Sequence, residues 1–119
     1  MLYVMNIEEL RNYCMAKKGV EETLPFGPDT IVFKVAGKVF LLTGFDNNPI
    51  NFNVKCDPEK AIELREKYTC VQPGYHMNKK HWNTIIGDGC ASDKLMCEWI
   101  DHSYNLVIDA LPKKQKRFY

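Results

Sequence analysis

The stretch "TIVFKVAGKVFLLT", residues 30–43, decides the fold because it has the pattern of a β-hairpin. Two runs rich in β-branched and aromatic residues flank Gly37, and such runs are typical of strands. The alternation leaves open whether the loop is Ala36-Gly37 or Gly37-Lys38. In either case one face of the hairpin collects five apolar side chains and is the expected core face: Ile31, Phe33, Val35, Phe40 and Leu42.

The segments next to this hairpin add a third strand and two helices. "INFNVK", residues 50–55, alternates apolar and polar side chains as a half-buried strand does. Asp57 and Pro58 form an N-cap and first helical residue, which predicts a helix through about Tyr68. Upstream, Asn6 and Glu9 have the form of a capping box, followed by helical spacing that Gly19 ends. "TLPFGPDT" then predicts an ordered loop into the hairpin.

The second half of the chain predicts two short strands and a long helix. "CVQPGY" and "WNTII" have strand character, and Pro73 suits a strand end. Ser92 is the expected N-cap of a helix with a wide apolar stripe, and Pro112 ends it. The predicted order is α-β-β-β-α-β-β-α in one domain spanning residues 1–119. We therefore expect an α+β fold with a mainly antiparallel sheet and helices packed on one face.

The opposite face of this sheet is expected to mix apolar and polar side chains. Its expected members are Val32, Lys34, Val39, Leu41, Thr43, Asn51, Asn53 and Lys55. Such a surface is too apolar to be indifferent to water and too polar to be core. The long helix, another copy of the chain and a ligand all remain open as its cover.

Composition and charge exclude several classes of protein. The chain has 119 residues, 45% hydrophobic and 26% charged, with a net charge of +1 that by itself predicts no polyanion partner. Apolar runs such as Val39 to Leu42 are far too short to span a bilayer, and no secretory signal is visible. Five cysteines form no CxxC pair, and their odd count argues against a disulfide framework. We expect a cytoplasmic protein with a basic tail at residues 112–119.

A metal site at "GYHMNKKHWNTI", residues 75–86, is not expected. His76 and His81 are five positions apart, which fits neither one face of a helix nor one face of a strand. Lys79 and Lys80, between them, would repel a cation. A fuller ligand set needs a fold that brings over three more side chains: Cys90, Cys97 and His102.

Enzyme chemistry is not expected either. No GxSxG motif, P-loop or glycine-rich dinucleotide fingerprint is present. Cys90 and His81 make a nucleophile pair on paper, but a chain with five cysteines and three histidines almost always offers one. We therefore predict no catalytic residues, no metal and no cofactor.

The same segment fits a nucleic-acid contact. Lys79 and Lys80 at a hairpin tip are suited to pair with phosphates, and His81 to donate to one. Trp82 is suited to stack on a base, but we favour a core position beneath the long helix because Ile85 and Ile86 continue a buried strand.

Five motifs together resemble the MmcQ/YjbR family: "LPFG", "FKVAGKVFLL", "VKCDPEKAIELRE", "PGYHMNKKHWNTI" and "SYNLV". The resemblance covers the chain from about Asn6 to the tail, with the motifs in order and correctly spaced. It implies a small cytoplasmic bacterial protein with a secretion-chaperone-like α/β fold. The family is usually labelled DNA-binding, with a "double wing" of two hairpins. By this resemblance one wing carries Lys34 and Lys38, and the other carries Lys79, Lys80 and His81.

We therefore predict a non-enzymatic protein that binds double-stranded DNA through phosphate contacts. Lys55, on the outward face of the strand between the wings, completes the expected set of contacts: Lys34, Lys38, Lys55, Lys79, Lys80 and His81. The alternative is a protein-interaction module that binds a partner chain, or a second copy of itself, on the mixed sheet face or an apolar helix flank. A membrane partner is not expected.

Overall fold

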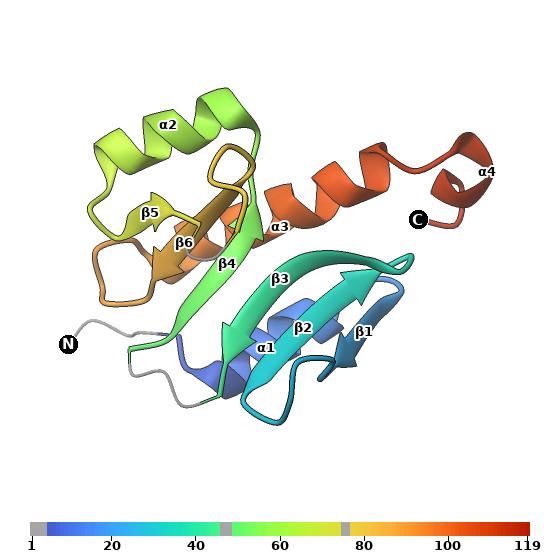
Figure 1. Cartoon of the computed structure of the whole chain (residues 1–119), viewed down its shortest axis with the longest axis horizontal. Coiled ribbons are helices and arrows are strands. Elements are labelled where there is room, and N and C mark those ends of the chain that lie inside the picture. Colours follow the sequence, from blue (N-terminus) through green and yellow to red (C-terminus); the bar gives the residue numbers. More distant parts are fainter. Residues whose placement is uncertain (1–4, 46–48, 75–76) are drawn as a thin grey trace.

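One antiparallel sheet of six strands organises the molecule. The computed structural model describes residues 5–45, 49–74 and 77–119. Its elements are α1 (Ile7–Met15), β1 (Val20–Thr23), β2 (Thr30–Val35), β3 (Lys38–Gly44), β4 (Asn51–Lys55), α2 (Pro58–Lys67), β5 (Val71–Pro73), β6 (Trp82–Ile86), α3 (Asp93–Asp109) and α4 (Lys113–Lys116). The strand order is β1-β2-β3-β4-β6-β5. Figure 1 shows α1 and α3 behind the strands and α2 beside β5. The expected α+β fold is confirmed.

The β2–β3 hairpin turns at Ala36 and Gly37, which resolves the alternative left open above. Val35 pairs with Lys38, so two residues form the loop. Both loop residues have positive φ angles, 51° and 75°. A two-residue loop with this backbone matches the twist of the flanking strands, and glycine adopts it without a steric cost.

The predicted helix starts are confirmed by their capping contacts. Asn6 and Glu9 form a reciprocal capping box at α1. The Asp57 side chain accepts from the Lys60 backbone N–H at α2, and Ser92 caps α3 in the same way. None of the helices in the described part of the chain is long and apolar enough to cross a membrane.

Strand β1 and helix α4 were not predicted. β1, "VEET", lacks apolar alternation because it is an edge strand that pairs only with β2 among the described strands. Its two glutamates are typical of a protected edge, where charge discourages pairing with another chain. α4 is a four-residue helix with no buried residue, so no core-facing stripe marks it.

Strand pairing divides the side chains of the sheet between two faces. Residues directly opposite each other on neighbouring strands point to the same side. The buried side consists of Ile31, Phe33, Leu41, Thr43, Phe52, Val54, Val71, Asn83 and Ile85. α1 and α3 pack here through Leu10, Cys14, Met96, Ile100 and Val107. The other side, which we call the open face, includes Val32, Leu42, Asn53, Thr84 and Gln72.

Three predicted face assignments on β3 are wrong, those of Leu41, Leu42 and Thr43. Phe33 pairs with Leu41 but the next residue, Lys34, pairs with Val39, so Phe40 is an extra residue in a β-bulge. Beyond a bulge every side chain changes face. Leu41 and Thr43 are therefore buried under the helices, whereas Leu42 lies half-buried on the open face.

Candidate functional site

Strands β3 and β4 separate at Phe40 and Lys55, where their pairing ends. Leu41 and Val54 form the last pair on this side. The hydroxyl of Ser103, on α3, donates to the Phe40 carbonyl over 2.5 Å and accepts from the Lys55 backbone N–H over 2.9 Å. The Ser103 side chain thus takes the place of the next backbone hydrogen bond between β3 and β4.

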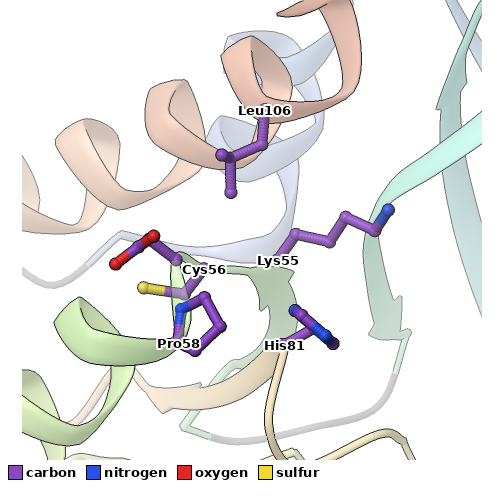
Figure 2. Close-up of a pocket in the computed structure, with 6 residues that line it drawn as sticks. Lys55, Cys56, Pro58, His81 and Leu106 are labelled. Atoms are coloured by element: carbon purple, nitrogen blue, oxygen red, sulfur yellow. The ribbon is translucent and has the colours of Figure 1, made fainter. Parts of the chain in front are cut away.

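Two hollows adjoin at Lys55, beside this separation. The first has a volume of about 190 Å³ and is lined by Lys55, Cys56, Asp57, Pro58, His81 and Leu106. In Figure 2 the Lys55 side chain runs between Leu106 of α3 and His81 of the β5–β6 hairpin. The second has about 250 Å³ and is lined by Lys38, Lys55, Val107, Ala110 and Leu111. We call the two together the α3 groove, because α3 contributes a lining residue to each, Leu106 and Val107.

The α3 groove brings together three of the six predicted site residues. Lys38 enters from the β2–β3 hairpin, Lys55 from the end of β4, and His81 from the β5–β6 hairpin. Lys79 and Lys80 are exposed next to His81 at the hairpin tip. In the part of the chain that the structure describes, no carboxylate lies within ion-pair distance of these four lysines. Their charge is therefore available to a ligand.

Lys34 does not reach the groove. It lies on the open face of β2, opposite Glu21 on one side and Val39 on the other. Its position follows from strand alternation, because the neighbouring Phe33 points into the core. The family resemblance assigned Lys34 and Lys38 to one wing, but of the two only Lys38 lies next to the turn.

Trp82 is buried, but not beneath the long helix as predicted. It pairs with Lys55, whose ammonium lies 5.9 Å from the centre of the indole ring. Asn83 and Ile85 point toward the helices, so alternation places Trp82 on the open face. Gly74 packs directly on it, since a Cβ at that position would lie 2.7 Å from the Trp82 Cβ. Trp82 thus supports the hairpin from the side away from α3.

Arg65, on α2, holds the hairpin tip from the other side and was missed by sequence reasoning. Its Nε donates to Asn83 Oδ1 over 2.7 Å, and its Nη2 donates to the Trp82 carbonyl over 3.2 Å and to the Lys79 carbonyl. Asn78 closes the tip by accepting from the Lys80 backbone N–H. A lone arginine near the end of a helix gives no sequence signal for such contacts.

Two titratable groups near the groove, the Cys56 thiol and the His102 imidazole, are held in their neutral forms. Burial raises the pKa of the Cys56 thiol to about 11, which keeps it protonated near neutral pH. Burial and Lys60 lower the pKa of His102, while Asp57 opposes them. His102 is held as a neutral acceptor, since its Nε2 receives the Asp57 backbone N–H over 3.2 Å.

The structure describes only some of the residues named in the metal and nucleophile alternatives. His81 precedes β6 and Cys90 follows it, so the strand separates them. His76 and Tyr75 lie outside the described residues. Among the residues that are described, the potential ligands that come together are Cys70, Asp88 and Cys90, with no histidine, and the two sulfurs are bonded to each other.

Comparison with known proteins identifies relatives over nearly the whole chain. The YjbR family model matches residues 15–106. The uncharacterized protein YbdF of Escherichia coli O157:H7 is 40% identical over 98 residues, covering 82% of this chain and 80% of that protein. The uncharacterized protein YjbR of Escherichia coli strain K12 is 33% identical over 113 residues, covering 95% and 96%.

Solved structures agree with this assignment. The Deinococcus radiodurans protein DR2400, of domain family DUF419, superposes with a TM-score of 0.90 at 35% identity, covering 96% of this chain and 87% of that chain. A Pseudomonas syringae protein superposes with a TM-score of 0.74 at 28% identity, covering 86% and 98%. The motifs, the fold and these relatives lead to one conclusion: the chain belongs to the YjbR family.

Proposed function

We propose that this protein binds double-stranded DNA through phosphate contacts in and beside the α3 groove. The observation that carries the proposal is the position of Lys38, Lys55 and His81, which come from three separate elements and line two hollows that share Lys55. Phosphate contacts from lysine supply most of the affinity of sequence-independent DNA binding. A groove with cations on both walls suits a phosphate backbone laid between the two hairpins.

The basic tail, residues 112–119, continues the positive charge of the groove beyond the end of α3. Ala110 and Leu111 line the groove together with Lys38, and the exposed α4 follows directly. Four cations lie in or next to α4: Lys113, Lys114, Lys116 and Arg117. Of these, Lys116 lies 3.8 Å from Asp109, a weak and exposed pair. DNA bound in the groove would therefore meet further positive charge beyond Leu111.

A salt titration with charge-removing variants tests the proposal. The parent should bind a duplex of generic sequence at about 50 mM salt, with log K falling linearly against log salt. Lys79→Ala combined with Lys80→Ala should flatten the slope by up to about 1.8, because each lost phosphate contact removes about 0.9. Adding Lys38→Ala and Lys55→Ala should flatten it further, and equally for different sequences.

A matched control removes the same charge elsewhere. Lys67 and Lys94 are exposed on α2 and at the start of α3, away from the groove. Lys67→Ala with Lys94→Ala should leave the slope within about 0.3 of the parent's if those lysines make no phosphate contact. If the control pair flattens the slope as much as Lys79 and Lys80, the binding is not localised to the groove. If the parent does not bind duplex at about 50 mM salt, the proposal fails.

A second candidate function, self-association or binding of a partner chain, is favoured by one observation. Leu24 and Phe26, in the loop between β1 and β2, are 50% and 73% exposed. Neighbouring exposed apolar side chains mark an interaction surface more often than isolated ones do. Sedimentation velocity on the same samples checks for a dimer, and Phe26→Ser should abolish any dimer that uses this loop.

A further inference from the structure

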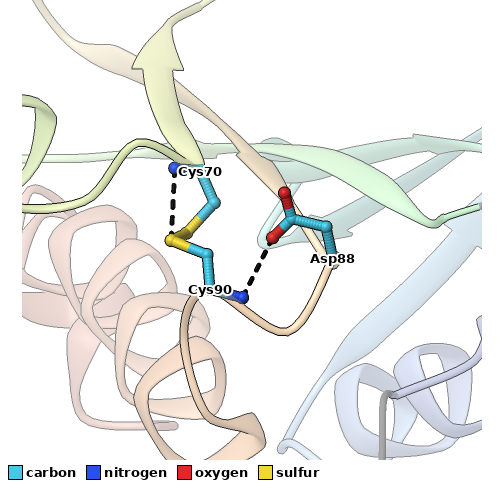
Figure 3. A group of neighbouring side chains, drawn as sticks. All are labelled: Cys70, Asp88 and Cys90. Atoms are coloured by element: carbon cyan, nitrogen blue, oxygen red, sulfur yellow. Dashed lines mark hydrogen bonds between the residues drawn. A yellow bond between two sulfur atoms is a disulfide. The ribbon is translucent and has the colours of Figure 1, made fainter.

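Cys70 and Cys90 join two elements that are distant in sequence. Cys70 directly precedes β5, and Cys90 lies in the connection between β6 and α3. Figure 3 shows the bond between their sulfurs. Their Cα atoms are 5.9 Å apart, within the range of ordinary disulfides. This bond was not expected from the cysteine spacing. The other three cysteines are free, with Cys14 and Cys56 buried and Cys97 half-buried.

The two members of the pair have different surroundings. Cys70 is 1% exposed, and its carbonyl accepts the Ile86 backbone N–H, so it is fixed within the sheet. Cys90 is exposed. The Cys90 sulfur accepts from the Cys70 backbone N–H over 3.3 Å and from the Thr69 hydroxyl over 3.7 Å. Both hydrogen bonds favour a thiolate when the bond is reduced.

The carboxylate of Asp88 acts in the opposite direction. Its Oδ1 accepts the Cys90 backbone N–H over 3.0 Å, which places a negative charge beside the sulfur. A neighbouring negative charge disfavours a thiolate. The hydrogen bonds and the carboxylate therefore offset each other in part, and exposure decides which sulfur an external reagent reaches first. That sulfur belongs to Cys90.

We propose that Cys70 and Cys90 form a reversible dithiol–disulfide pair, with Cys90 as the attacking thiol and Cys70 as the resolving thiol. The oxidant is a low-molecular-weight disulfide of the glutathione class. The Cys90 thiolate attacks one sulfur of that disulfide, forms a mixed disulfide and releases one small thiol. Cys70, as it loses its proton, attacks the Cys90 sulfur and releases the second small thiol. Two electrons and two protons thus pass from the protein to the reagent.

Oxidation closes the segment between the two cysteines into a loop. The 20-residue separation includes β5, the hairpin tip and β6. β5 has three residues and lies at the edge of the sheet, with β6 as its one neighbour among the described strands. A cross-link over a loop of this size restricts the unfolded chain. Reduction should therefore lower the melting temperature by roughly 10 °C and increase amide exchange in β5.

Alkylation in denaturant followed by intact mass measurement tests the pairing. After equilibration with glutathione disulfide, the parent should show three reactive thiols, those of Cys14, Cys56 and Cys97. After dithiothreitol it should show all five cysteines of the chain. A peptide map should find Cys70 joined to Cys90. Five reactive thiols under both conditions would overturn the proposal, and so would a melting temperature that reductant leaves unchanged.

Single variants test the order of the two steps. Cys70→Ser should accumulate a mixed disulfide with glutathione at Cys90, because the resolving thiol is gone, whereas Cys90→Ser should leave the native Cys70 unmodified. Cys97→Ser, the control, should show one reactive thiol fewer than the parent in each condition, two after oxidation and four after reduction, and should still form the bond between Cys70 and Cys90. A mixed disulfide on Cys70 instead of Cys90 would reverse the roles and refute the assignment. One equivalent of zinc that keeps both thiols reduced, with Asp88 as third ligand, would also refute it. These measurements use no DNA and are independent of the function proposed above.

Discussion

Replacing Ser103 by alanine removes only one hydroxyl group, but it should destabilise the protein strongly. The side chain is completely buried, and its hydroxyl connects the Phe40 carbonyl to the Lys55 backbone N–H. These two groups come from strands that no longer bond to each other directly at this level. Ser103→Ala therefore leaves one buried acceptor and one part-buried donor without a partner.

The magnitude follows from the number of groups left unpaired. An unsatisfied buried polar group costs about 1–3 kcal/mol, so the two groups together set a range of about 2–6 kcal/mol. Lys55 is half-buried, which lets its N–H recover part of the loss by contact with water. Alanine also has a higher helix propensity than serine by about 0.5 kcal/mol. We expect a net loss of about 2–4 kcal/mol in the free energy of unfolding.

Urea denaturation and hydrogen exchange measure the effect. With an m-value of about 1.5 kcal/mol/M, the loss lowers the urea midpoint by roughly 1.3–2.7 M. The amide of Lys55 should lose protection, because its acceptor is the deleted hydroxyl. In a DNA-binding assay under conditions where the variant is fully folded, Lys55 should also contribute less to binding, because the end of β4 is no longer fixed.

Ser92, the only other serine of the chain, is the matched control. Its hydroxyl also accepts a backbone N–H, that of Leu95, but at an exposed helix start. Ser92→Ala should cost about 1 kcal/mol, the usual value for a lost N-cap. If Ser103→Ala costs no more than Ser92→Ala and the Lys55 amide stays protected, the Ser103 hydroxyl does not link β3 to β4 as described.

Two further predictions concern the surroundings of the groove. Arg65→Ala should lower the free energy of unfolding by about 2 kcal/mol in urea melts, and Arg65→Lys should recover less than half of this loss, because an ammonium lacks the planar guanidinium that reaches three oxygens. Arg117→Ala, in the exposed tail, is the control. Full rescue by lysine would contradict the assignment. Burial and Lys60 lower the pKa of His102 in the folded state, so the unfolded chain binds a proton at His102 more tightly than the folded chain does. The contribution of neutral His102 to the free energy of unfolding is therefore present above the ordinary pKa of histidine and is lost as the pH falls. Between about pH 7 and pH 5 the parent should lose more stability than His102→Gln, and parallel curves would exclude this role.

The sequence by itself determined the elements whose signals are local. Asn6 and Glu9, Asp57 and Pro58, and Ser92 each start a helix by contacts within one turn, and the structure contains all three caps. Gly37 predicted the position of the hairpin turn to within one residue. The motifs also identified the family. Of the six residues predicted as contacts, Lys38, Lys55 and His81 line the two hollows, and their role in binding stays a prediction.

Only the tertiary structure decided which groups meet. The bulge at Phe40 exchanged Leu41 and Leu42 between the faces, and no composition signal marks an extra residue in a strand. Ser103 reaches Phe40 across 63 positions, and Cys70 reaches Cys90 across 20. Such partners are selected by the packing of whole elements against one another. Caps and turns depend on neighbouring residues and can be predicted, whereas the groove and the bridging hydroxyl require α3 to lie against the sheet, and the disulfide requires Cys70 and Cys90 to meet beside β5 and β6.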